Sequence, residues 1–225
     1  MSGAGGIQQG PVQFTPATSI KEAEVFAKNN GVKYPEFTGM GIEQANNFNL
    51  ALSKVPTKAK PDFVANGAEW KKATDGIIGR KKDQWYGASS HTISLRYKNE
   101  VYLSGALEGD FQTIAINARQ YKTIDSISER KKYIQNKYKE QTGNSFFLNT
   151  NGKFLPLHEM GHTYSNKKYL PKKWEELSAR WHKETKIDLL KNNREAFAEG
   201  FADYLGNDGK KLPSYIKDFM DDFIE

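Results

Sequence analysis

Hydrophobic residues recur at helical spacing in the first quarter of the chain. Residues 20–27 form an amphipathic segment, in which Ser19 and Glu22 have the spacing of a capping box and Gly31 is a natural stop. A second helix is expected over 42–53, because apolar residues repeat there before two prolines. The pattern therefore predicts two helices near the N-terminus.

The second half of the chain has a helical pattern almost throughout. A charged helix is expected over 125–141, with Ile127 and Tyr133 on its packed side. Pro, Asn or Gly residues then separate four further helices, expected over residues 155–166, 171–186, 193–206 and 213–224. This half is therefore predicted to be a helical assembly.

Alternating polar and apolar residues predict a small sheet in the middle of the chain. Residues 91–97 alternate, Lys98-Asn99 can form a turn, and 100–103 continues the pattern, which together predict a hairpin. Residues 146–148 predict a further short strand. Strands mixed with helices, and helices grouped at the C-terminus, predict the α+β class.

Length and charge limit the organisation of the chain. Its 225 residues suit one domain, expected over 17–225 after a Gly-, Gln- and Pro-rich segment, 1–16, interpreted as a flexible linker or a cloning remnant. The net charge is +6, but acidic residues are interleaved with several basic clusters. We therefore expect a solvated basic surface and no nucleic-acid partner.

Composition also excludes several kinds of site. The chain has no cysteine, which excludes a disulfide scaffold, a Cys-ligated metal and a thiol nucleophile. No segment has the pattern of a membrane span or a signal peptide. The compartment stays undefined, and a cytoplasmic or a virion-associated protein both fit.

One short string carries specific chemistry: His158-Glu159-Met160-Gly161-His162. Histidines four residues apart on a helix lie about 40° apart around its axis, so His158 and His162 can bind one Zn²⁺. Glu159, about 100° from His158, can reach a water on that metal and act as general base. Three protein ligands plus water are typical of a catalytic zinc.

The third ligand is expected to be an acid further along the chain. The metzincin pattern would place a histidine at Lys168, so it is absent. On the helix over 193–206, Glu195 and Glu199 stack at i, i+4, beside small alanines that permit close approach of another helix. We interpret Glu195 as the third ligand and Glu199 as the acceptor of a ligating histidine's free N–H. Other downstream acids lack such a partner: Glu175, Glu176, Glu184 and Asp188.

The combination HEMGH, a spacer of 32 residues, and EAFAEGF resembles the zincin domain of the lethal-factor-type metalloproteases, which include the Pro-Pro endopeptidases. The resemblance covers residues 155–206. It implies a zincin-like fold, one zinc ion, a peptide or protein substrate, the ligands His158, His162 and Glu195, and Glu159 as base. In that group a tyrosine seven residues before the ligand Glu helps to stabilise the oxyanion, and Asp188 occupies this position. The candidates to replace it are Tyr164, Tyr169, His182 and Tyr204.

A second resemblance concerns residues 14–52, which are similar to a segment of phage minor head, or head-morphogenesis, proteins. It implies that 17–55 is an N-terminal helical segment and that the chain is a prophage-associated effector or processing module, with the upstream head protein as a candidate partner.

Two alternative functions stay open. One is an inactive phage structural module with a structural zinc, and the other is an ADP-ribosyltransferase using Glu22-Ala23-Glu24, although these residues lie in an expected helix near the start of the chain.

Overall fold

The computed structural model describes residues 13–66, 87–91, 112–116 and 123–224. Every helix expected from the sequence is found there, with ends within two residues of the prediction. They are α1 (Ile20–Asn29), α2 (Ile42–Lys54), α4 (Ile124–Thr142), α5 (Leu155–Lys168), α6 (Lys172–Thr185), α7 (Asn193–Asn207) and α8 (Ser214–Phe223). Short 3-10 helices cover Thr57–Ala59, Gly152–Phe154 and Asp188–Lys191.

A small mixed sheet completes the described fold. Its strands are β1 (Tyr34–Pro35), β2 (Phe63–Asn66), β3 (Gly87–His91) and β4 (Gln112–Ile116), in the order β1-β2-β4-β3. β1, β2 and β4 run parallel, and β3 is antiparallel to β4. This combination of helices and a small sheet is an α+β arrangement, as expected.

Two expectations from the sequence are wrong, and a third falls almost wholly outside the described residues. The hairpin predicted over 91–97 and 100–103 lies outside the described residues except for His91, the last residue of β3. The strand predicted at 146–148 is wrong, because the amides of Phe146 and Phe147 both donate to the Gln135 side chain instead of a neighbouring strand. Tyr133 is 55% exposed, so its predicted packing is also wrong.

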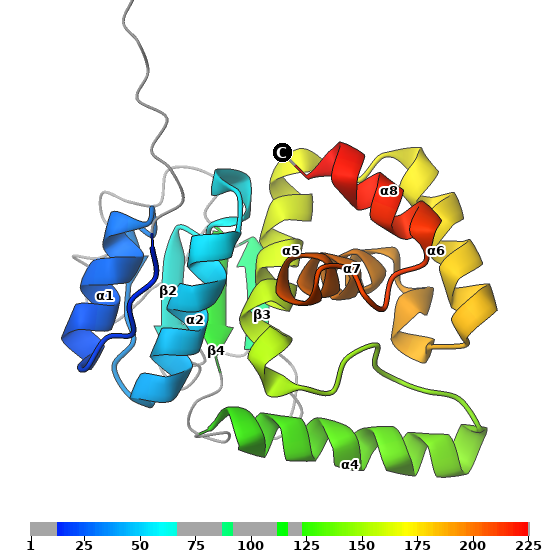
Figure 1. The fold of residues 1–225 in the computed structure, drawn as a ribbon, viewed down its shortest axis with the longest axis horizontal. Coiled ribbons are helices and arrows are strands. Elements are labelled where there is room, and N and C mark those ends of the chain that lie inside the picture. The colour runs from blue at the N-terminus through cyan, green and yellow to red at the C-terminus, as the bar shows by residue number, and fades with distance from the viewer. Residues whose placement is uncertain (1–12, 67–86, 92–111, 117–122, 225) are drawn as a thin grey trace, which may run out of the picture.

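Helix α5 occupies the middle of the molecule (Figure 1). It packs against β3 and β4 on one side, where α1 and α2 also cover the sheet, and against α7 on the other. In Figure 1, α6 lies on the far side of α7 from α5, α8 runs above α7 from near the upper end of α5 toward α6, and α4 runs along the lower edge of the view. Residues on α5 therefore lie between the sheet-containing half and the helical half.

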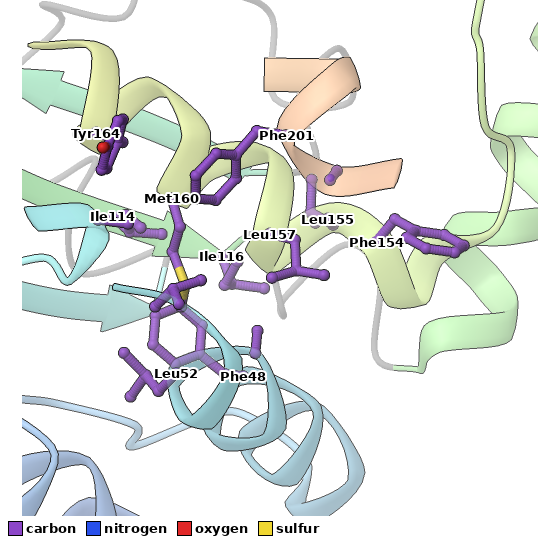
Figure 2. Packing of buried hydrophobic residues seen from close by; sticks show 14 of the residues in the cluster. Phe48, Leu52, Ile114, Ile116, Phe154, Leu155, Leu157, Met160, Tyr164 and Phe201 are labelled. Carbon is purple, nitrogen blue, oxygen red and sulfur yellow. The ribbon is translucent and has the colours of Figure 1, made fainter. Parts of the chain in front are cut away.

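The buried core continues through α5 into both halves. Figure 2 shows Met160 of α5 directed toward Phe48 and Leu52 of α2, while Phe201 approaches α5 from α7. All four of these residues are fully buried. Burial of a side chain of this size contributes about 1.5–3 kcal/mol, so α5 is held firmly on both sides.

Candidate metal centre

The two histidines of the central helix face the same side, as their spacing predicts. Pro156 lies in the first turn of α5, where its missing N–H costs no helical hydrogen bond. The ring centroids of His158 and His162 are 4.9 Å apart, and the ring planes are inclined by 84°. Their side chains are only 12% and 16% exposed. The core on both sides of α5 therefore holds the imidazoles in a largely buried position.

Helix α7 crosses α5 at close range because both helices have small residues at the crossing. A Cβ atom added to Gly161 would lie 2.9 Å from the Ala198 Cα and 3.1 Å from the Phe201 Cβ. Ala198 and Ala202 are buried. This confirms the prediction that the alanines of α7 let another helix approach, and it brings the first turns of α7 next to the imidazoles.

Glu195 completes a group of three ligand-type side chains. Its Oε2 lies 3.2 Å from His158 Nε2 and 3.5 Å from His162 Nε2. One ligand atom from each of the three residues lies within 4.8 Å of the other two, a group that could hold a metal ion. The three residues proposed as ligands from the sequence are therefore brought together.

Glu199 lies one turn beyond Glu195, on the far side of the first imidazole. Its Oε1 is 3.2 Å from His158 Nδ1, and its side chain is 4% exposed. That buried nitrogen makes no hydrogen bond of regular geometry with any described group, Glu199 included, so the two atoms are close but not well aligned. The structure thus places Glu199 where an acceptor for the second ring nitrogen of a metal ligand is expected.

Opposite charges dominate the electrostatics of the group. Burial lowers the pKa of His158, but its contacts with Glu195 and Glu199 outweigh this effect and raise the pKa to about 10. Burial raises the pKa of Glu195, and the two imidazoles overcome it and hold the pKa below the usual range. Metal ligands must be deprotonated to bind, so a bound cation would displace the proton of His158.

Glu159, the expected base, is 5% exposed. Burial raises the pKa of its carboxyl, while the charges of His158 and His162 act in the opposite direction. The carboxyl therefore lies close enough to interact electrostatically with both histidines. A raised pKa is suited to a group that must accept and then return a proton.

Three of the four candidate oxyanion donors have hydrogen-bond partners other than the three ligands, and the fourth is exposed. The Tyr164 hydroxyl donates to the Phe223 carbonyl, and Tyr204 donates to Asp221. Tyr169 is 84% exposed at the end of α5, and His182 Nδ1 lies 2.9 Å from the Ile187 carbonyl. Tyr164 follows His162 by two residues, hence about 200° around the helix, so the two side chains point in opposite directions.

Asp188 is also directed elsewhere, since it pairs with Lys191. The hydrogen bonds described for Tyr164, Tyr204 and His182 are made with Phe223, Asp221 and Ile187. An oxyanion donor among the candidates stays a prediction.

Sequence reasoning did not identify Lys131 of α4, which is 5% exposed. Its Nζ lies 3.4 Å from the Asn149 carbonyl and 4.9 Å from the centre of the Phe147 ring. Burial is the largest influence on the pKa values of Glu159 and Glu199, and the Lys131 charge opposes it in both. Lys131 follows the buried Ile127 by four residues, so the two share a face of α4, and this spacing could have identified Lys131 as buried.

No family model, curated protein or solved structure matches this chain. In the described part of the chain, no helix is long and apolar enough to cross a bilayer. The functional assignment therefore depends on the geometry of the site.

Proposed function

We propose that this chain is a zinc-dependent endopeptidase with a zincin-like fold. His158, His162 and Glu195 would hold one zinc ion, and Glu159 would act as general base. The observation that carries this proposal is the convergence of two imidazole nitrogens and a carboxylate oxygen within 4.8 Å. Two nitrogens and one oxygen from protein form a common donor set of catalytic zinc.

The donor set fits zinc in its chemistry as well as in its spacing. Both imidazoles direct Nε2 toward the Glu195 oxygen, and the other ring nitrogen of His158 faces Glu199. A carboxylate that accepts from the free N–H fixes the orientation of a ligating histidine and increases its basicity. The buried Glu199 thus supports ligation by His158 Nε2.

When bound, zinc supplies a Lewis acid for the scissile carbonyl and lowers the pKa of a water molecule. Glu159 would accept a proton from the attacking water and return it to the leaving amine, and burial raises the pKa of its carboxyl, which suits both transfers. His158, His162 and Glu195 would hold the ion, and the hydrophobic packing of α5 keeps bulk water from one side of the helix.

Strand β3 provides an edge beside α5 along which a peptide substrate could lie. Among the described strands it pairs with β4 alone, and it contacts α5. An extended peptide can add to such an edge through main-chain hydrogen bonds. β3 ends at His91, the first residue of the hairpin that the sequence predicts.

The phage-related role remains part of this proposal. The segment 17–55, most of which resembles phage minor head proteins, forms α1, the short strand β1 and α2, and so contributes one strand to the sheet. A processing enzyme or effector attached to a head protein is consistent with that arrangement. The alternative of a structural zinc predicts a fourth protein ligand in place of water, whereas the described residues offer three.

The substitution Glu159→Gln tests the proposal. It keeps the size of the side chain and removes its ability to accept a proton, so we expect zinc content to stay at one per chain. Cleavage of a peptide library should fall by at least about 100-fold, the lower end of what a general base contributes. Glu176→Gln, on the exposed surface of α6, is the matched control and should cleave normally.

Metal analysis and cleavage separate the alternatives. Zinc binding without cleavage in the unsubstituted protein would support a structural module. Cleavage that persists in the Glu159→Gln variant would contradict the role of Glu159 as base.

A further inference from the structure

The position of Glu195 depends on the first turn of α7. Glu195 is the third residue of that helix, and its side chain is 32% exposed, more than either histidine. First-turn residues receive no helical hydrogen bond on their amides, so other groups must hold them. The Asn192 side chain accepts from the amides of Arg194 and Glu195 at 2.9 and 3.2 Å. This cap shapes the turn but does not connect it to the histidines.

A chain of side-chain hydrogen bonds makes that connection. The Arg194 guanidinium donates to Asn166 Oδ1 on α5, and Asn166 Nδ2 donates to Gln112 Oε1 on β4 at 3.0 Å. Gln112 is 1% exposed, and its main-chain N–H donates to the Asp62 carboxylate. The first turn of α7 is thereby tied to α5 and, through it, to the sheet.

The spacing along α5 shows why this tie bears on the site. Asn166 follows His162 by four residues, as His162 follows His158, so the three side chains form one stripe along the helix. The first turn of α7 meets this stripe with two consecutive residues. Glu195 contacts the two histidines, and Arg194 contacts the asparagine.

The opposite side of the same turn is held separately. Trp174 and Ser178 of α6 donate to the main-chain and side-chain oxygens of Asn193, each at 2.8 Å. These contacts hold α7 in the helical half of the molecule. The link from Arg194 to Asn166 instead joins the first turn of α7 to the histidine-bearing face of α5.

We infer that Asn166 and Arg194 are positioning residues, which hold Glu195 at ligand distance from His158 and His162. This inference rests on the proposed zinc site and deepens it. Neither residue needs to touch the metal or the substrate. Their effect is to keep the carboxylate of a partly exposed first-turn residue in place before a metal binds, so that binding does not have to order it.

The test is the zinc affinity of purified full-length variants, measured by competition with a chromophoric chelator. Asn166→Ala and Arg194→Met should each weaken zinc binding by about tenfold, the lower end of what residues that orient metal ligands contribute. Because the two residues act through one another, the double variant should be no weaker than the weaker single variant. Arg180→Met is the matched control, since Arg180 is an exposed arginine paired with Glu184 on α6.

A conservative variant separates positioning from a general loss of stability. Asn166→Asp retains an oxygen that can accept from Arg194, so it should restore zinc affinity to within about threefold of the original. Visible spectra of the Co²⁺-substituted proteins should change in Asn166→Ala and not in Arg180→Met.

The two proposals fail in different ways. If the unsubstituted protein binds zinc and the Asn166 and Arg194 variants bind it equally well, or if their losses add, the positioning role is overturned. If the unsubstituted protein binds no zinc, the proposed function fails, and the positioning role fails with it.

Discussion

At the scale of single residues, the site is a set of buried charges that compensate one another. Glu159 and Glu199 are 5% and 4% exposed, and the charges of His158 and Lys131 act to lower the pKa of both. Burial of an unpaired charge is costly, so each acid is retained where a positive group faces it. A dication bound by His158, His162 and Glu195 would add to this compensation.

Glu199→Gln tests the part of this arrangement that lies behind His158. The glutamine keeps the volume of the side chain but lacks its charge, so it should hold the imidazole less well in the orientation that ligates through Nε2. We expect zinc affinity to fall by about 10–100-fold, with the fold retained. Glu140→Gln, on the exposed face of α4, should leave the affinity unchanged. Equal affinity in both variants would show that Glu199 does not support the ligand.

The residues that could be predicted from the sequence are those joined by short-range geometry. The spacing of His158 and His162, and of Glu195 and Glu199, determines which pairs share a helix face. The sequence offers Tyr164 as one candidate oxyanion donor, but the turn of α5 directs its hydroxyl away, to Phe223. Asn166 and Arg194 were missed because their contact joins two helices that are distant in sequence.

At the scale of helices and strands, the site depends on the close crossing of α5 and α7. Only a residue without Cβ fits at Gly161, where that atom would lie 2.9 Å from the Ala198 backbone. The helices cannot separate there without moving Glu195 from the histidines. Packing at Gly161 and metal-site geometry are therefore coupled.

Gly161→Ala should lower both stability and zinc affinity. The added methyl group forces the helices apart, at a cost of about 1–3 kcal/mol in the free energy of unfolding. Gly143→Ala is an informative comparison. Its Cβ would meet nothing within 4 Å, but φ is 75°, so it should cost about 1–2 kcal/mol through backbone strain alone and leave zinc affinity unchanged. Denaturant unfolding and chelator competition measure the two effects, and unaltered zinc binding in Gly161→Ala would contradict the coupling.

Helices were predicted well because their signals are local. The N-cap role of Ser19 is confirmed, because its side chain accepts from the Glu22 main-chain N–H. The Glu22 carboxylate accepts from the main-chain N–H and the hydroxyl of Thr18. The parallel strands were missed because they are short and pair with distant segments, as when Phe63 pairs with both Tyr34 and Thr113. A run such as 146–148 has strand-like composition, yet the Gln135 side chain satisfies its amides.

At the scale of the whole molecule, α5 joins the half that contains the sheet to the helical half. Its buried side chains contact α2 and the sheet on one side and α7 on the other (Figures 1 and 2). The proposed ligands come from α5 and α7. A bound metal would therefore cross-link two helices at the centre of the fold.

Removal of the metal should lower the stability of the whole protein. A ligand that binds only the folded state stabilises it by about 2.7 kcal/mol when its free concentration is 100 times Kd. For a chain of this size that corresponds to a difference in Tm of about 5–10 °C. Scanning calorimetry with zinc and with excess chelator measures it. The difference should shrink strongly in Glu195→Gln, and a difference of equal size in that variant would place the zinc elsewhere.

The most direct test of the central claim is the anomalous diffraction, at the zinc edge, of crystals grown with one equivalent of zinc. We expect one zinc peak, with His158 Nε2 and His162 Nε2 at about 2.0–2.1 Å, a Glu195 oxygen at about 2.0–2.2 Å, and one position occupied by solvent. A peak located elsewhere, a fourth ligand from the protein, or a Glu195 carboxylate turned away from the metal would contradict it.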